Sequence, residues 1–260
     1  MDVKDRIVVV TGAAGGIGRA LALRFAQAGA RKVVCADLDE AGAKETAAMI
    51  DGVARRVDVA REDDVRALIE ETEAGIGPID LFCCNAGVST RGGAEVPDEV
   101  WQRIWEINVM GHIYAARHLV PRMIARGGGY FLNTASAAGL LSQVGSAPYA
   151  VTKHAAVAFA EWLALTHGDD GIKVSVLCPQ AVRTNMIKGK EDGVASVNGL
   201  MDPEPVAEEC LRCIEAETFL VLPHKEVLTY MRNKTENYDR WIGGMRKLNR
   251  KYGKPAAAAE

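Results

Sequence analysis

The sequence has neither a long apolar run nor a large excess of charge of one sign. No uninterrupted apolar stretch approaches the roughly 18 residues of a membrane-spanning helix, and the N-terminus lacks the apolar segment and cleavage site of a signal peptide. The formal net charge of the 260 residues is only −3, so the overall charge does not favour nucleic acid or a membrane surface as a partner. We therefore predict a cytoplasmic protein.

The six cysteines form no disulfide or metal-binding pattern. The C-x-x-C at 210–213 falls within a helical pattern and has no second pair of ligands, which argues against zinc. The other four lie in apolar, strand-like runs, where a reduced thiol behaves as a small hydrophobic side chain. They are Cys35, Cys83, Cys84 and Cys178. We predict no metal site and a reducing compartment.

Apolar β-branched runs alternate with helical patterns along most of the chain. This alternation predicts an α/β protein with a Rossmann-type, doubly wound parallel β-sheet of about seven strands and helices on both faces. The predicted strands are 6–10, 32–36, 53–58, 80–84, 129–135, 172–178 and 219–222. The predicted helices are 16–29, 39–50, 62–75, 98–126, 149–167 and 204–216. We expect one domain over 1–254 and a disordered tail over 255–260.

Residues 185–202 are rich in Gly, Lys, Ser and Asn and have weak periodicity, which indicates a loop or a broken helix. The segment follows the predicted strand 172–178 and so leaves the carboxyl edge of the sheet, where open α/β sheets bind ligands. We predict a substrate lid here. A surface connection without a function is the alternative.

A glycine-rich turn follows the first predicted strand and opens the first helix. Gly12, Gly16 and Gly18 would let the backbone turn tightly and approach a pyrophosphate at the helix N-terminus. The spacing is G-x-x-x-G-x-G, whereas the common dinucleotide motif is G-x-G-x-x-G. Taken alone, the turn is therefore also compatible with a tight strand-to-helix connection.

Asp37 ends the second predicted strand, 19 residues after Gly18. A carboxylate at that distance can accept hydrogen bonds from the adenosine ribose and would repel a 2′-phosphate. Neither Leu38 beside it nor Gly15 in the turn brings a compensating positive charge, so we predict NAD as the cofactor. The alternative role for Asp37 is a helix N-cap before Glu40.

Two further strand ends are candidates for contacts with the cofactor. Asp58 and Val59 follow the third strand and could lie beside an adenine, although Asp58 could equally cap the next helix. The small residues Asn85-Ala86-Gly87 follow the fourth strand, as a backbone pressed against a cofactor requires. A simple turn would have the same composition.

Tyr149 and Lys153 are four residues apart in a predicted helix, so their side chains project from one face. A nearby cation favours the phenolate and lowers the tyrosine pKa, which makes proton transfer near neutral pH feasible. Ser136 lies 13 residues upstream of Tyr149, after the fifth predicted strand. In isolation, either feature would be read as an ordinary helix face or strand-end turn.

Together these residues resemble the short-chain dehydrogenase/reductase family over roughly residues 5–225. The resemblance implies an oxidoreductase in which Tyr149 is the general acid/base and Ser136 binds the substrate oxygen. It further implies that Lys153 lowers the tyrosine pKa and binds the nicotinamide ribose, and that Asn108 holds a water linking Lys153 to solvent. The residues that carry the resemblance are Thr11-Gly12-x-x-x-Gly16-x-Gly18, Asn85-Ala86-Gly87, Asn108, Ser136 and Tyr149-x-x-x-Lys153.

One departure from the family pattern is Gln180, which stands after Pro179 where the family usually has glycine. Its amide would reach into the substrate pocket or point at solvent, and we favour the pocket. The expected cofactor-binding residues are Gly12, Gly15, Gly16, Ile17, Gly18, Asp37, Leu38, Asp58, Val59, Asn85, Ala86, Gly87, Tyr149, Lys153, Pro179, Val182 and Thr184. The expected substrate-binding residues are Ser136, Ala138, Gln143, Tyr149, Gln180 and Met186.

Residues 224–254 carry nine basic and three acidic side chains together with four aromatic ones. We interpret this segment as an amphipathic helix whose aromatic side chains dock on the core while the basic face stays in water. Recognition of a phosphate, as on a coenzyme A thioester, or of a nucleic acid is the alternative. Because no other nucleic-acid-binding motif is present, we predict no nucleic-acid partner.

The predicted function is NAD-dependent transfer of hydride between a small-molecule secondary alcohol, or the corresponding ketone, and the nicotinamide. Reduction of a 3-oxoacyl thioester and a catalytically silent NAD-sensing role are the alternatives. The helix that begins at Tyr149 is rich in alanine, which permits close helix packing. Because family members pair this helix across subunits, the resemblance also implies a homodimer or homotetramer.

Overall fold

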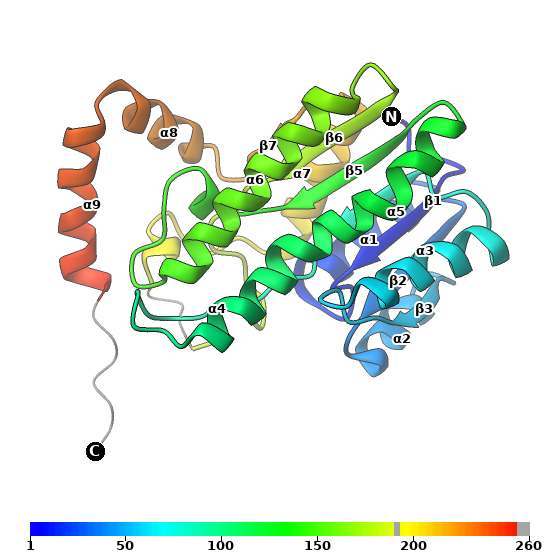
Figure 1. Ribbon diagram of the computed structural model, residues 1–260, viewed down its shortest axis with the longest axis horizontal. Helices are drawn as coiled ribbons and strands as arrows, with labels where there is room; N and C mark the ends of the chain where they lie inside the picture. The colour runs from blue at the N-terminus through cyan, green and yellow to red at the C-terminus, as the bar shows by residue number, and fades with distance from the viewer. Residues whose placement is uncertain (190–192, 254–260) are drawn as a thin grey trace.

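The computed structural model describes residues 1–189 and 193–253. Within them, seven parallel strands form one sheet in the order β3-β2-β1-β4-β5-β6-β7. This is the doubly wound arrangement that the alternating pattern predicted, and Figure 1 shows helices in front of and behind the sheet. The strands are β1 (Ile7–Thr11), β2 (Lys32–Asp37), β3 (Val53–Arg56), β4 (Leu81–Cys84), β5 (Gly129–Thr134), β6 (Ile172–Leu177) and β7 (Leu220–Val221).

The strands are apolar along their length because helices cover both faces of the sheet. In β5, Tyr130 and Leu132 pack into one hydrophobic cluster while Phe131 between them packs into the other, as the two-residue period of a strand requires. One face is covered by α1 (Gly16–Gln27), α2 (Glu40–Ala48) and α7 (Pro203–Glu215). The other is covered by α3 (Glu62–Gly75), α5 (Gly111–Ala125) and α6 (Ala147–His167), with α4 (Asp98–Trp105) packed beside α6.

The predicted helix 98–126 is interrupted in the structure. Between α4 and α5, residues Glu106–Met110 form a π-helix, a widened turn that often occurs at functional sites. Asn108 lies in this turn. The hydrophobic periodicity did not reveal the interruption, because apolar residues continue on both sides of it.

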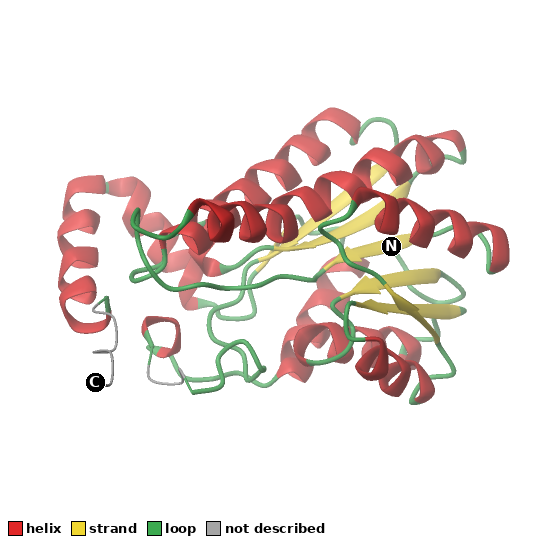
Figure 2. Ribbon diagram, turned by 60° about the horizontal axis from the view of Figure 1, so that its bottom comes forward, coloured by secondary structure: helices red, strands yellow, loops and turns green. Residues whose placement is uncertain are grey.

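The C-terminal segment differs from its prediction. It forms two helices, α8 (Glu226–Glu236) and α9 (Tyr238–Tyr252), separated at Asn237, whose side chain accepts a hydrogen bond from the Arg240 amide at 2.9 Å and caps α9. The predicted docking of its aromatic residues on the core is wrong for α9, none of whose residues is buried. Figures 1 and 2 show α8 and α9 at one end of the molecule, outside the layers around the sheet.

The remaining predictions concern the chain's loops and ends. The described part of 185–202 is irregular, with a single 3-10 turn at Val194–Ser196, as expected for a loop. Residues 190–192, Lys254 and the predicted tail 255–260 lie outside the described residues, so the predicted domain extent of 1–254 stays a prediction. No helix of the described part is long and apolar enough to span a membrane.

Candidate active site

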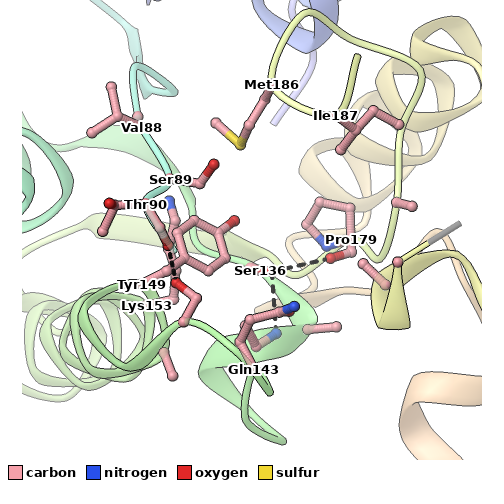
Figure 3. A pocket seen from close by; sticks show the side chains of 18 of the residues that line it. Val88, Ser89, Thr90, Ser136, Gln143, Tyr149, Lys153, Pro179, Met186 and Ile187 are labelled. Atoms are coloured by element: carbon pink, nitrogen blue, oxygen red, sulfur yellow. Dashed lines mark hydrogen bonds between the residues drawn. The ribbon is translucent and has the colours of Figure 1, made fainter. Parts of the chain in front are cut away.

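A single continuous cavity of about 1910 Å³ opens at the carboxyl edge of the sheet. Every residue predicted to bind cofactor or substrate lines it except Gly18, and of the predicted catalytic residues only Asn108 lies outside its wall. Segments far apart in the sequence meet here because the carboxyl ends of parallel strands share one edge. Figure 3 shows the part of the cavity around Tyr149.

The glycine-rich turn packs directly against the loop after β4. Gly12 has a φ of +69°, and a Cβ there would lie 2.9 Å from the Cα of Ala86, so only glycine permits this close approach. A Cβ on Gly18 would overlap the Gly12 carbonyl oxygen. Gly15, in contrast, faces the cavity and has no atom within 4 Å of an added Cβ. The turn therefore leaves open space at the start of α1, where a helix N-terminus favours an anion.

Asp37 is held at the edge of the cavity by the backbone. One carboxylate oxygen accepts a hydrogen bond from the Ala14 amide and the other from the Asp39 amide, both at 2.9 Å. The N-cap of α2 is Asp39, which accepts from the Gly42 amide at 3.2 Å, so the alternative role of Asp37 as that cap is wrong. Arg56 pairs with Asp37 in the sheet register but does not line the cavity.

Asp58 faces the same end of the cavity. Its carboxylate accepts a hydrogen bond from the Ala60 amide at 3.0 Å and forms a 3.3 Å ion pair with Arg103. Because α3 begins only at Glu62, Asp58 closes a turn before the helix and does not cap it. Arg103, which also lines the cavity, was not singled out from the sequence.

Ser136, Tyr149 and Lys153 come together on one wall of the cavity. The buried Ser136 hydroxyl accepts a hydrogen bond from the Ala138 amide at 3.1 Å and donates to the Pro179 carbonyl at 3.4 Å. Lys153 Nζ donates to the Thr134 carbonyl at 3.0 Å and lies 5.7 Å from the centre of the Tyr149 ring. Tyr149 and Ser136 lie next to each other in Figure 3.

Burial shifts the pKa values of both titratable groups. It raises the pKa of Tyr149, and the hydrogen bond with Ser136 opposes this only in part. Burial also lowers the pKa of Lys153 to about 8. The sequence predicted a lowered tyrosine pKa, whereas the protein alone raises it because the cost of desolvating a phenolate dominates.

Asn108 is completely buried, and its side chain is paired within the protein. Its oxygen accepts from the Val88 amide, and its nitrogen donates to the Val88 carbonyl, both at 2.9 Å. The nitrogen also contacts the Thr152 hydroxyl at 3.2 Å. The side chain thus ties the π-helix to α6 and to the loop after β4. The predicted water between Asn108 and Lys153 stays a prediction.

Gln180 faces the cavity and links two segments. Its side-chain oxygen accepts a hydrogen bond from Asn198 at 3.0 Å, and Asn198 accepts from the Tyr230 hydroxyl at 3.1 Å. All three residues line the cavity. Gln180 therefore joins the end of β6 to the predicted lid and to α8, a role for which the sequence contained no signal.

The far end of the cavity is formed by residues that we did not predict for the site. They come from α9 and are apolar at i, i+4, i+7 and i+11, a helical period that is visible in the sequence. From the sequence, we predicted only that the aromatic side chains of this segment dock on the core. The four residues are Trp241, Met245, Leu248 and Tyr252.

Comparisons with known proteins agree with this fold. Residues 6–195 match the family model described as short chain dehydrogenase. The chain is 40% identical over 198 residues to 1-deoxy-11-beta-hydroxypentalenate dehydrogenase of Streptomyces exfoliatus, covering 73% of this chain and 72% of that protein. It is 30% identical over 233 residues to epidermal retinol dehydrogenase 2 of Homo sapiens, covering 85% and 75%.

A solved structure gives the same result. The short-chain dehydrogenase/reductase of Burkholderia phymatum in complex with NAD superposes with a TM-score of 0.85 at 27% identity, covering 92% of this chain and 96% of that one. The chain belongs to the short-chain dehydrogenase/reductase family. It is an oxidoreductase of the kind that acts on alcohol or ketone substrates.

Lys153 supplies a test of the burial described above. The ammonium group of Lys153 loses its proton near pH 8 in the folded protein but only at about pH 10 in the unfolded chain. The charged lysine therefore destabilises the folded state fully below pH 8. Stability rises as the pH increases between those two values. At pH 7, Lys153→Met should raise the free energy of unfolding by about 2 kcal/mol, after allowance for the lost hydrogen bond to Thr134.

The measurement is urea unfolding at several values between pH 6 and pH 10. The gain in the free energy of unfolding of Lys153→Met over the parent protein should shrink as the pH rises. Lys188→Met, at an exposed lysine, should show no such trend. A Lys153→Met protein that is less stable than the parent at pH 7 would contradict the assigned burial cost.

Proposed function

We propose that this protein is an NAD-dependent oxidoreductase that transfers hydride between a secondary alcohol, or the corresponding ketone, and the nicotinamide. One observation carries the proposal: Tyr149, Ser136 and Lys153 meet on the wall of the same cavity that extends to Asp37 and the glycine-rich turn. Relatives named as dehydrogenases of a hydroxypentalenate and of retinol support an alcohol as the substrate.

The cavity suits a dinucleotide from the glycine-rich turn to Tyr149. The open space at Gly15 accepts a pyrophosphate, and Asp37 has its carboxylate at the wall, positioned by two backbone amides. Asp58 and Val59 line the cavity and would flank the adenine, while Pro179, Val182 and Thr184 also line it and would lie beside the nicotinamide. The related structure in complex with NAD supports this cofactor.

The bound cofactor supplies the hydride acceptor or donor. In oxidation, the Tyr149 phenolate takes the proton of the substrate hydroxyl, and Ser136 hydrogen-bonds the substrate oxygen as it becomes a carbonyl. Lys153 lies close enough to stabilise the phenolate, and the positive charge of oxidised nicotinamide adds to this effect. That charge would act against the burial that raises the tyrosine pKa in the protein alone.

Tyr149→Phe tests the proposed chemistry. The variant loses the hydroxyl that transfers the proton, so NADH formation from NAD and secondary alcohols should fall by about 100-fold or more, since general acid–base catalysis contributes factors of this size. NADH binding, measured by fluorescence, should persist. A variant that retains turnover contradicts the assigned role of Tyr149, and an unmodified protein that binds NADH but oxidises no alcohol would favour the sensing role.

Asp37→Ser tests the cofactor preference. Removing the carboxylate removes the repulsion of a 2′-phosphate, so the ratio of kcat/KM for NADP to that for NAD should rise about tenfold or more. Glu40→Gln removes a nearby negative charge that does not line the cavity and is the matched control. An equal rise in both variants would mean that general charge, and not Asp37, sets the preference.

We also propose that the protein is a homodimer or homotetramer that works in the cytoplasm. Large apolar side chains are exposed on the outer surface of α6 and α4, and all six cysteines are free and buried, which suits a reducing compartment. The apolar residues are Val151, Trp162 and Leu165 on α6, and Val100 and Trp105 on α4.

Analytical ultracentrifugation tests the oligomer. The protein should sediment as a dimer or tetramer, and Trp162→Glu should shift it toward the monomer, because a charge placed in an apolar interface has no partner there. Met49→Glu, at an exposed apolar residue on the opposite face of the sheet, should leave the mass unchanged. A monomeric parent protein would contradict the proposal.

A further inference from the structure

Helix α9 presents its apolar stripe to the cavity. Trp241, Met245, Leu248 and Tyr252 are half-buried, whereas the basic residues on the other side of the helix are exposed. An amphipathic helix normally buries its apolar stripe against the protein core. Here no side chain of α9 is buried, and the stripe forms a wall of the space that also contains Tyr149.

The rest of this end of the cavity is also largely apolar. The lining side chains include Val88, Leu141, Val144, Met186, Ile187 and Val197, from three loops at the carboxyl edge of the sheet. Arg240 lines the cavity but is paired with Glu236 at 2.9 Å. The other charged side chains nearby, Arg91 and Glu95, have opposite signs. Among residues 1–189 and 193–253, this end therefore offers no concentrated charge for a phosphorylated or polyanionic substrate.

Lys234 fixes α9 relative to the catalytic residues. Although it is only 8% exposed, it forms no ion pair with any carboxylate in the described part of the chain. Instead, Nζ donates to the carbonyls of Leu140 at 2.7 Å and Leu141 at 3.0 Å. The same atom lies 4.9 Å from the ring centre of Trp241, a distance at which a cation is attracted to the ring face.

These contacts connect three parts of the site. Lys234 belongs to α8, Trp241 to the first turns of α9, and Leu140 and Leu141 to the loop that follows Ser136. A buried ammonium group needs partners for its N–H donors. The two loop carbonyls and the ring of Trp241 are those partners, so together they determine where Lys234 lies. The position of the α9 wall is thereby coupled to the segment that carries Ser136.

We infer that α9 selects the substrate of the proposed function: a secondary alcohol or ketone on a bulky hydrocarbon body, for which fused-ring compounds serve as the probes. The body lies against Trp241, Met245 and Leu248 while the reacting carbon lies at Tyr149 and Ser136. Lys234 is a positioning residue for this wall. The cavity, at about 1910 Å³, exceeds the range of roughly 300–1000 Å³ typical of a small-molecule site, so it has room for both a dinucleotide and such a body.

Leu248→Glu tests the wall. The substitution places a carboxylate where the apolar body would lie, so the ratio of kcat/KM for fused-ring secondary alcohols to that for 2-butanol should fall by about tenfold or more. Because α9 buries no residue, the variant should fold. The matched control is Ile242→Glu on the same helix, which is 47% exposed and does not line the cavity.

Calorimetry can measure the binding of a fused-ring ketone to the unmodified protein, to Leu248→Glu and to Ile242→Glu. This measurement does not depend on turnover. Weaker binding to Leu248→Glu alone supports the wall even if the proposed chemistry fails. The inference would be overturned by equal binding to all three proteins, by equal losses in the two variants, or by an unmodified protein that prefers 2-butanol. In each of these cases, turnover of 2-butanol would leave the proposed function intact.

Lys234→Met tests the positioning role. Without the ammonium group, the KM for a fused-ring alcohol should rise about tenfold relative to that for 2-butanol, because Lys234 positions the wall and does not touch the reacting atoms. Lys234→Arg retains the charge and the donors and should restore most of the affinity. Lys247→Met, at an exposed lysine of α9, is the control. An unchanged KM in Lys234→Met would overturn this role.

Discussion

The site depends on a hydroxyl that ties two strand ends together. Thr11, the last residue of β1, donates to the Cys83 carbonyl at 3.1 Å and accepts from the Asn85 amide at 2.9 Å, so the segments that follow β1 and β4 are held in contact. The same hydroxyl accepts from the Ala86 amide at 3.2 Å, and Gly12 packs on Ala86 beside it. Because parallel strands are all oriented alike, one such tie aligns the glycine-rich turn, the Asn85 loop and the end of β5 along a single edge.

Burial then determines the chemistry of the groups gathered at that edge. It raises the pKa of Tyr149 and lowers that of Lys153, so in both groups the protein alone shifts the equilibrium toward the neutral form. The same low polarity strengthens any interaction between the phenolate and a bound cation. The π-helix contributes by placing Asn108 between the loop after β4 and α6, which fixes the helix that carries both Tyr149 and Lys153.

Much of the fold could be predicted, because the residues that determine it act locally. The strands β1 to β6 were predicted within two residues at each end, since buried parallel strands are continuous runs of β-branched and other apolar residues. The role of the α9 stripe was not predicted. Trp241 and Leu248 show the same helical period whether they face a core or a cavity, and Gln180 has no local pattern that indicates contact with Asn198.

By itself, the sequence determined the order of strands and helices, the glycine-rich turn and the residue types available for proton transfer, because periodicity, backbone freedom and side-chain chemistry are properties of short segments. Only the tertiary structure decided which of those groups meet. It placed Ser136 beside Tyr149 and Asp58 against Arg103, and it turned α9 toward the cavity. These are contacts between segments distant in the chain, and they depend on how the layers pack.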